Sequence, residues 1–182
     1  MENKNPHVQP TQLNPPEREN KMRKFPLVLA IAMLSTPAFS GEEEIYGTWK
    51  LAGMQRKIVE TGQILDAFGP NPRGFLMYGQ AGRMIVLIAT SNRPKPESID
   101  KVTDQQRADL FRSMVAYTGT YKFDGKRVEH QIDVSWNEIW AGTLLKLEAV
   151  KNGDRLTYTT APIPFAGDGK ISVTTLTWER VN

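Results

Sequence analysis

The sequence predicts an all-β protein, an eight-stranded up-and-down antiparallel barrel with one helix between the third and fourth strands. Three observations lead to this fold class. Apolar and polar residues alternate at a period of two through most of residues 41–182, as they do in half-buried strands. Asp124-Gly125 and Asn152-Gly153 are dipeptides typical of tight hairpin turns. Long and short connections alternate along the chain, so the two ends of the sheet are expected to differ.

The first 40 residues differ in composition from the rest of this 182-residue chain. Residues 1–21 contain four prolines and almost no large apolar side chains, so they cannot bury enough surface to offset the entropy lost on ordering. We expect this N-terminal extension to be disordered. Residues 41–182 are the remaining 142 of 182 residues, which is enough for one domain with a sizeable core.

Residues 22–40 have the layout of a secretory signal peptide. Two basic residues precede an apolar run at residues 25–34, and small residues follow, with the expected cleavage between Ser40 and Gly41. A membrane-spanning helix needs about 20 apolar residues, whereas this run has ten. We therefore expect an exported protein, periplasmic or secreted, whose mature chain has no integral membrane segment.

Charge and cysteine content exclude several classes of protein. Of 23 basic and 20 acidic residues, five basic and three acidic ones lie in residues 1–40, which leaves 18 against 17 in the mature part. This near-neutral balance gives no electrostatic footprint for nucleic acid. Cysteine is absent, which excludes disulfides and a lipid-bearing cysteine. Because His130 is the sole histidine after residue 40, a histidine-based or cysteine-based metal site is excluded as well.

The first three strands precede the helix. Residues 47–58 alternate with Trp49, Leu51 and Gly53 on one face, and residues 74–79 and 83–90 are short apolar runs rich in branched and aromatic side chains. A helix is expected within residues 103–117, because Thr103 can cap it. Its apolar side is formed by Leu110, Phe111, Met114 and Val115.

Five strands follow the helix. Residues 120–135 form a hairpin around Asp124-Gly125, in which one face is expected to hold Val128, His130, Ile132 and Val134. Residues 143–160 form a second hairpin around Asn152-Gly153, and residues 171–181 form the last strand.

The connections decide how these strands are arranged. The long ones cover about residues 59–72, 90–116, 136–142 and 161–170, and all of them are odd-numbered. In an up-and-down sheet they therefore lie at one end, the mouth, and the tight turns lie at the other. Eight strands suit a closed barrel that can hold one small ligand. The alternative is an open sandwich of two four-stranded sheets with the helix on one face.

The two ends of the predicted barrel domain are expected to meet at the end opposite the mouth. Gly47 allows a tight entry of the backbone, Trp49 can plug the floor, and the Arg180 guanidinium can lie across the indole. The alternative is that Trp49 is an ordinary core aromatic and Arg180 a surface charge.

A first strand with Gly-x-Trp and an Arg near the end of the last strand resembles the lipocalin signature. The finer resemblance is to the bacterial and fungal lipocalin-like domain family, and it covers Tyr46 to Val181. The stretches that carry it are GTWKL, FGPNPRGFLMYGQAGRM, AYTGTYKFDGKRVEHQIDVS, WAGT, DRLTYTTAPIP and LTWERV. The resemblance implies an eight-stranded calyx of mostly undetermined activity and supplies no catalytic residues.

His130 is the first candidate for a functional side chain, because the predicted register points it into the barrel. It either hydrogen-bonds a ligand, acts as a general base, or is a structural histidine whose ring nitrogens are satisfied by a neighbouring Tyr or Thr. Tyr158 and Tyr121 are the candidate partners on inward faces.

Three further candidates lie near the mouth. Trp136 and Trp140 stand in a long connection, where they either grip an apolar ligand or pack beneath the loop. Arg73 follows two prolines and either meets a ligand carboxylate or pairs with a neighbouring acid.

Three functions remain open at this point. The first is an exported protein that binds a small hydrophobic or amphipathic molecule in the barrel. The second is an enzyme, an isomerase or dehydratase of a hydrophobic metabolite, with His130 as base. The third is a filled barrel that acts as a structural or interaction module. No phosphate-binding glycine loop, dinucleotide fingerprint or hydrolase serine motif is present, so no cofactor is predicted.

Overall fold

The computed structural model describes residues 41–181 of the chain. The predicted disordered extension, residues 1–21, and the predicted signal peptide, residues 22–40, lie outside the described residues. The long strands are β1 (Gly47–Ile58), β3 (Arg73–Tyr78), β4 (Arg83–Ala89), β5 (Met114–Phe123), β6 (Arg127–Ser135), β7 (Leu144–Asn152), β8 (Arg155–Thr160) and β10 (Ile171–Arg180). The remaining elements are the short strands β2 (Ile64–Asp66) and β9 (Ile163–Pro164), the helix α1 (Asp104–Arg112) and the 3-10 turns η1 (Gly41–Ile45) and η2 (Glu138–Trp140).

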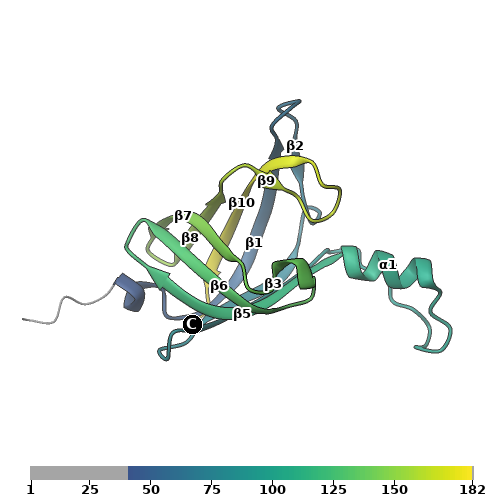
Figure 1. Ribbon diagram of the computed structural model, residues 1–182, viewed down its shortest axis with the longest axis horizontal. Coiled ribbons are helices and arrows are strands. Elements are labelled where there is room, and N and C mark those ends of the chain that lie inside the picture. The colour runs from purple at the N-terminus through teal and green to yellow at the C-terminus, as the bar shows by residue number, and fades with distance from the viewer. Residues whose placement is uncertain (1–40, 182) are drawn as a thin grey trace, which may run out of the picture. The chain divides into compact units, whose positions relative to one another are not determined.

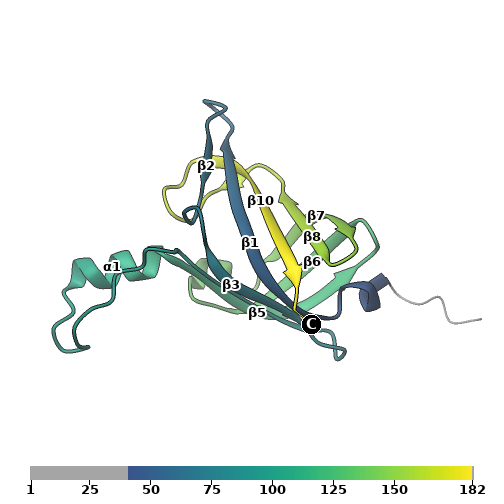
Figure 2. The ribbon, with the colours of Figure 1, turned by 180° about the vertical axis from the view of Figure 1, so that it is seen from behind.

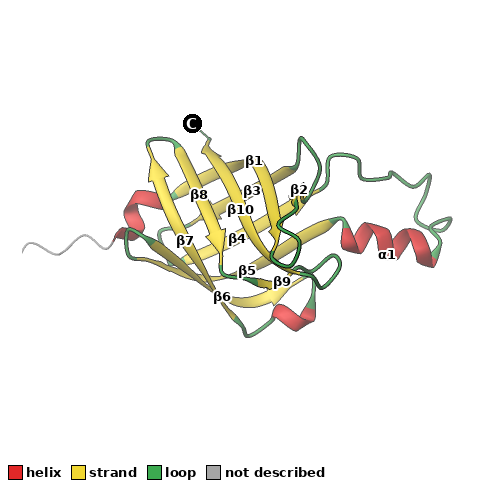
Figure 3. Ribbon diagram, turned by 90° about the horizontal axis from the view of Figure 1, so that it is seen from above, coloured by secondary structure: helices red, strands yellow, loops and turns green. Residues whose placement is uncertain are grey.

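The eight long strands form a closed antiparallel barrel (Figures 1 and 3). Neighbouring strands pair in the order β1-β3-β4-β5-β6-β7-β8-β10, and β10 returns to pair with β1. Figure 2 shows this closing pair side by side. The predicted eight-stranded up-and-down barrel is confirmed, and the open sandwich is wrong. Closure leaves the long strands without a free edge.

The predicted position of the helix relative to the strands was wrong. It was placed between the third and fourth strands, whereas α1 follows β4. The reason is β2, a three-residue strand within the first long connection that pairs with the mouth end of β1. The helix is also shorter than expected, because Met114 and Val115 already belong to β5. Thr103 caps it, and Gln106 completes a capping box.

Two bulges change which side chains face inward. The pairing of β1 shifts between Leu51 and Gly53, so Met54 rather than Gly53 follows Leu51 on the buried face. A second shift lies opposite Thr118 and Gly119, and it turns Val134 outward, with 63 % of its surface exposed. The predicted inward positions of Gly53 and Val134 were therefore wrong, because a single extra residue reverses the alternation.

The tight turns and the long connections lie at opposite ends of the barrel. Gly125 and Gly153 adopt positive φ of 93° and 58° in the two turns, as the Asp-Gly and Asn-Gly dipeptides predict. We call the turn end the floor. At the mouth, the connection between β4 and β5 carries α1 away from the barrel wall (Figure 3).

The floor is closed by residues from both ends of the domain. Trp49 is completely buried, its Nε1 donates to the carbonyl oxygen of Ile45 at 2.8 Å, and the Arg180 Cζ lies 4.3 Å from its ring centroid. The Arg180 guanidinium donates to the carbonyl oxygens of Tyr46 and Glu44. Gly47 has φ of 114°, and a Cβ there would lie 3.0 Å from Nη1 of Arg180. A glycine is therefore required where the chain enters β1.

Candidate functional site

A cavity occupies the mouth half of the barrel, above the floor formed around Trp49. Its volume is about 90 Å³. Its wall is predominantly apolar and includes Met54, Leu76, Val86, Ile88, Leu147 and Trp178. All four long connections contribute to its lining, through Phe68, Phe111, Trp140 and Phe165 among others. The cavity therefore opens at the end that the loop lengths predicted as the mouth.

A continuous chain of polar groups is buried at the base of this cavity. Tyr158 Oη lies 2.8 Å from Tyr78 Oη, which lies 2.6 Å from His130 Nε2. The other ring nitrogen, Nδ1, lies 3.0 Å from Tyr117 Oη. These four side chains come from β3, β5, β6 and β8, so inward positions of strands far apart in sequence converge on one point. We call them the Tyr–His chain.

Burial sets the protonation states of the Tyr–His chain. It lowers the pKa of the His130 imidazole from its ordinary 6.5 to about 3 and raises the pKa of Tyr78 well above 10. It also raises the pKa values of Tyr117 and Tyr158. All four groups are therefore neutral at pH 7. Both nitrogens of His130 are engaged by hydroxyls, which disfavours a role as general base.

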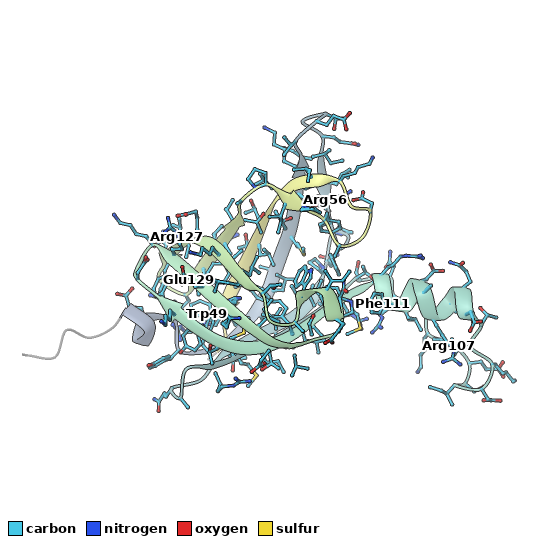
Figure 4. All side chains as sticks on the ribbon, viewed as in Figure 1. Trp49, Arg56, Arg107, Phe111, Arg127 and Glu129 are labelled. Atoms are coloured by element: carbon cyan, nitrogen blue, oxygen red, sulfur yellow. The ribbon has the colours of Figure 1, made fainter. Side chains whose placement is uncertain are left out.

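Aromatic side chains connect the Tyr–His chain to the rim. Trp140 packs edge-on against Tyr117 with centroids 5.8 Å apart, and against Trp136 with centroids 5.0 Å apart. Trp136 in turn lies 6.1 Å from the ring of Phe111 and donates from Nε1 to the Phe111 carbonyl oxygen at 3.3 Å. Phe111 stands at the barrel end of α1 (Figure 4). Both tryptophans thus pack with each other and line the cavity.

A partly buried ion pair fastens the loop between β9 and β10 over the other side of the mouth. The Arg56 guanidinium contacts both carboxylate oxygens of Asp168, at 2.8 and 2.5 Å, and stacks 4.2 Å above the centroid of Phe165. Hydrogen bonding from Arg56 lowers the pKa of Asp168 to about 2. Arg56 lies toward the mouth end of β1, well away from Trp49 (Figure 4).

The other predicted site residues lie in different environments. Tyr158 and His130 line the cavity and belong to one hydrogen-bonded chain. Tyr121 pairs with His130 across β5 and β6, but its hydroxyl donates to the Gly79 carbonyl oxygen at 3.0 Å, and it is not part of the cavity lining. Arg73 begins β3, is exposed, and lies outside the lining too. The structure therefore brings Arg73 to neither the cavity nor its polar base. The Tyr121 ring packs against Tyr78 with centroids 4.4 Å apart, but within the described part of the chain no hydrogen bond joins its hydroxyl to His130.

Sequence reasoning missed the two hydrogen-bond partners of His130. Tyr78 shares the inward face of β3 with Leu76, and Tyr117 lies four residues before Tyr121 on the same face of β5. The period-two pattern could have placed both tyrosines inside the barrel. Which inward side chains meet depends on the stagger of neighbouring strands, for which the sequence carried no signal.

No curated protein matches the chain. The crystal structure of a mutant of the fluorescent protein UnaG aligns with 14% sequence identity and a TM-score of 0.33, covering 76% of this chain and 97% of that chain. A family model described as lipocalin-like domain matches residues 46–181. The match covers most of the chain, from the entry to β1 to the end of β10, and the chain therefore belongs to the lipocalin-like domain family.

Proposed function

We propose that this protein binds a small, largely apolar organic molecule in the cavity of its barrel. The main support for this function is the cavity itself, which combines an apolar wall, an aromatic rim and a buried polar base in one concave space. Ligand sites commonly consist of an apolar lining with a few polar groups that fix the orientation of the ligand.

The size of the cavity supports a compact ligand. About 10–15 Å³ of such volume accommodates one water molecule, so about 90 Å³ leaves room for several atoms beyond a single water. Burial of apolar ligand surface contributes about 25 cal/mol for each Å². This gain supplies the affinity, because the described lining offers few polar contacts to compete with water.

The enzyme alternative gains no support from the geometry. A base must reach the proton that it removes, and both nitrogens of His130 are within 3.0 Å of tyrosine hydroxyls. Its pKa of about 3 also makes the imidazole a weak base at neutral pH. We therefore favour binding over proton transfer.

Titration with the small fluorescent dye 1-aminoanthracene tests this proposal. The variant Val86→Phe fills the cavity from β4, whereas Ile85→Phe adds the same group to the neighbouring outward position, which is 48 % exposed. We expect dye binding by the unaltered protein and by Ile85→Phe, and at least tenfold weaker binding by Val86→Phe. Failure of the unaltered protein to bind would support the filled barrel instead.

We also propose that the protein is exported to the periplasm or secreted. The support is the sequence of residues 22–40, with its basic start, short apolar run and small residues before Gly41. Expression of the full chain in its host should yield extracytoplasmic protein with Gly41 as its first residue, measured by intact mass. The variant Ala38→Arg should block this cleavage. Recovery of uncleaved chain from the cytoplasm alone would refute export.

A further inference from the structure

The Tyr–His chain contains one more hydrogen-bond donor than its own acceptors can use. With a neutral imidazole, the chain holds three hydroxyl protons and one ring proton, but only three hydrogen bonds link its four members. Each bond uses one proton, so every arrangement of directions leaves a single proton without an acceptor inside the chain. An unpaired buried donor costs free energy unless another molecule accepts from it.

The surplus proton is best placed at an end of the chain that faces the cavity. Tyr117 and Tyr158 are the two ends, and both line the cavity, whereas the central Tyr78 does not. Tyr117 is 8% exposed and Tyr158 only 1%. The favoured arrangement therefore runs from Tyr158 through Tyr78 to His130, whose Nδ1 donates to Tyr117 Oη and leaves the Tyr117 hydroxyl proton for the cavity.

A second donor in the same wall lacks an acceptor. Trp178 is 1% exposed and lines the cavity, and its buried Nε1 has no hydrogen-bond partner within residues 41–181. Buried indole N–H groups usually find one. This observation does not depend on the proton count, and it too indicates that the wall offers more hydrogen-bond donors than it has acceptors.

Positive charge is scarce at this site. Arg112 is the one charged residue in the described lining, its side chain is 58% exposed, and it already faces Asp109 at 3.4 Å. A carboxylate placed against the Tyr–His chain would be desolvated without a buried cation to compensate, which is costly.

We propose that the ligand is an uncharged molecule whose carbonyl, ether or nitrile group accepts a hydrogen bond from the Tyr117 hydroxyl. This inference rests on the proposed function, since it names the chemistry of the molecule held in the same cavity. The apolar part of the ligand packs between the rim aromatics and the barrel wall. The acceptor points toward the base of the cavity.

Benzonitrile and phenylacetylene form a matched pair of probes. They have nearly the same shape, but only the nitrile is a good acceptor, and its stretching frequency reports whether it is hydrogen-bonded. A neutral hydrogen bond contributes about 0.5–1.5 kcal/mol net, so the unaltered protein should bind benzonitrile about threefold to tenfold more tightly than phenylacetylene. The bound nitrile should absorb at the frequency of a hydrogen-bonded nitrile. Benzoate should bind more weakly than either probe.

Three variants identify the donor. Tyr117→Phe should abolish the preference for benzonitrile and the hydrogen-bonded nitrile band, while it still binds phenylacetylene. Tyr158→Phe should keep both, as should the control Tyr121→Phe, whose hydroxyl donates to the Gly79 carbonyl oxygen. A preference that survives in Tyr117→Phe, or benzoate binding as tight as that of benzonitrile, would overturn the inference. Failure of phenylacetylene to bind the unaltered protein would instead refute the proposed function.

Discussion

Removal of the hydroxyl at the centre of the Tyr–His chain should destabilise the protein far more than removal of one at its end. Tyr78→Phe deletes two hydrogen bonds, of 2.6 Å to His130 Nε2 and of 2.8 Å to the Tyr158 hydroxyl. Both of these groups then remain buried without their hydrogen-bond partner. Each group left unsatisfied costs about 1–3 kcal/mol, so we expect a loss of about 3 kcal/mol. Tyr158→Phe removes one bond, and Tyr78 can still donate to His130. Its expected cost is about 1 kcal/mol.

The double variant distinguishes this reasoning from simple loss of contacts. Once Tyr78 is Phe, the Tyr158 hydroxyl has lost its partner, so its removal should cost nothing further or restore a few tenths of a kcal/mol. The double variant should therefore be about as stable as Tyr78→Phe alone, with a coupling energy of about 1 kcal/mol. The free energies of unfolding of the unaltered protein, the two single variants and the double variant can be measured by urea unfolding, followed by tryptophan fluorescence.

A control cycle uses a tyrosine outside the chain. Tyr121→Phe removes the hydroxyl that donates to Gly79, and it should add to Tyr158→Phe within about 0.5 kcal/mol. If Tyr78→Phe and Tyr158→Phe were equally additive, the four groups would not act as a connected network, and the proton count drawn from them would fail.

Three further predictions concern the floor, the buried histidine and the mouth. Arg180→Ala should lower the free energy of unfolding by about 2–3 kcal/mol, because the contact with Trp49 and two backbone hydrogen bonds are lost, and Arg180→Lys should recover part of it in urea unfolding. Because the folded pKa of His130 is about 3 and its ordinary value is 6.5, unfolding takes up a proton between these pH values. The contribution of His130 to the free energy of unfolding should therefore be constant above pH 6.5 and fall by up to about 1.4 kcal/mol per pH unit as pH decreases toward 3. If the urea midpoint of His130→Asn were as sensitive to acid as that of the unaltered protein, this reasoning would be contradicted. Asp168→Asn should weaken the ion pair by which Arg56 holds the β9–β10 loop, and dye release measured by stopped-flow fluorescence should become several-fold faster. The loss of stability should be only about 1 kcal/mol, because Asp168 is more than a third exposed. An unchanged release rate would show that this loop does not limit ligand exit.

The architecture was largely predictable because local signals determined it. The Asp124-Gly125 and Asn152-Gly153 turns place their hairpins without reference to the rest of the chain, and the odd positions of the long connections follow from counting. The errors arose where one residue changes the outcome. The extra residues at the bulges near Gly53 and Val134 reverse the alternation of their strands, and nothing in the local pattern marks a bulge.

The candidate site was less predictable because it depends on register. His130 and Tyr158 were placed inside the barrel correctly by their strand patterns, yet Tyr121 was preferred to Tyr117 and Tyr78 was not considered. Tyr117 and Tyr121 lie on one inward face but differ by four residues, or about 13 Å along a strand. That difference decides whether a hydroxyl reaches His130 or the carbonyl of Gly79. It depends on the stagger of several strands at once, and β2 shows how easily a three-residue strand escapes a pattern search.

The pairing of β1 with β10 has a consequence for the order of events during synthesis. The first strand cannot pair with its last partner until the ten residues of β10, Ile171–Arg180, have left the ribosome. Until then the nascent chain exposes an unsealed edge along Gly47–Ile58. Maturation should therefore be sensitive to early termination: a chain that stops before Ile171 keeps seven of its eight long strands, yet has no way to seal the seam and remains prone to join a strand of another chain.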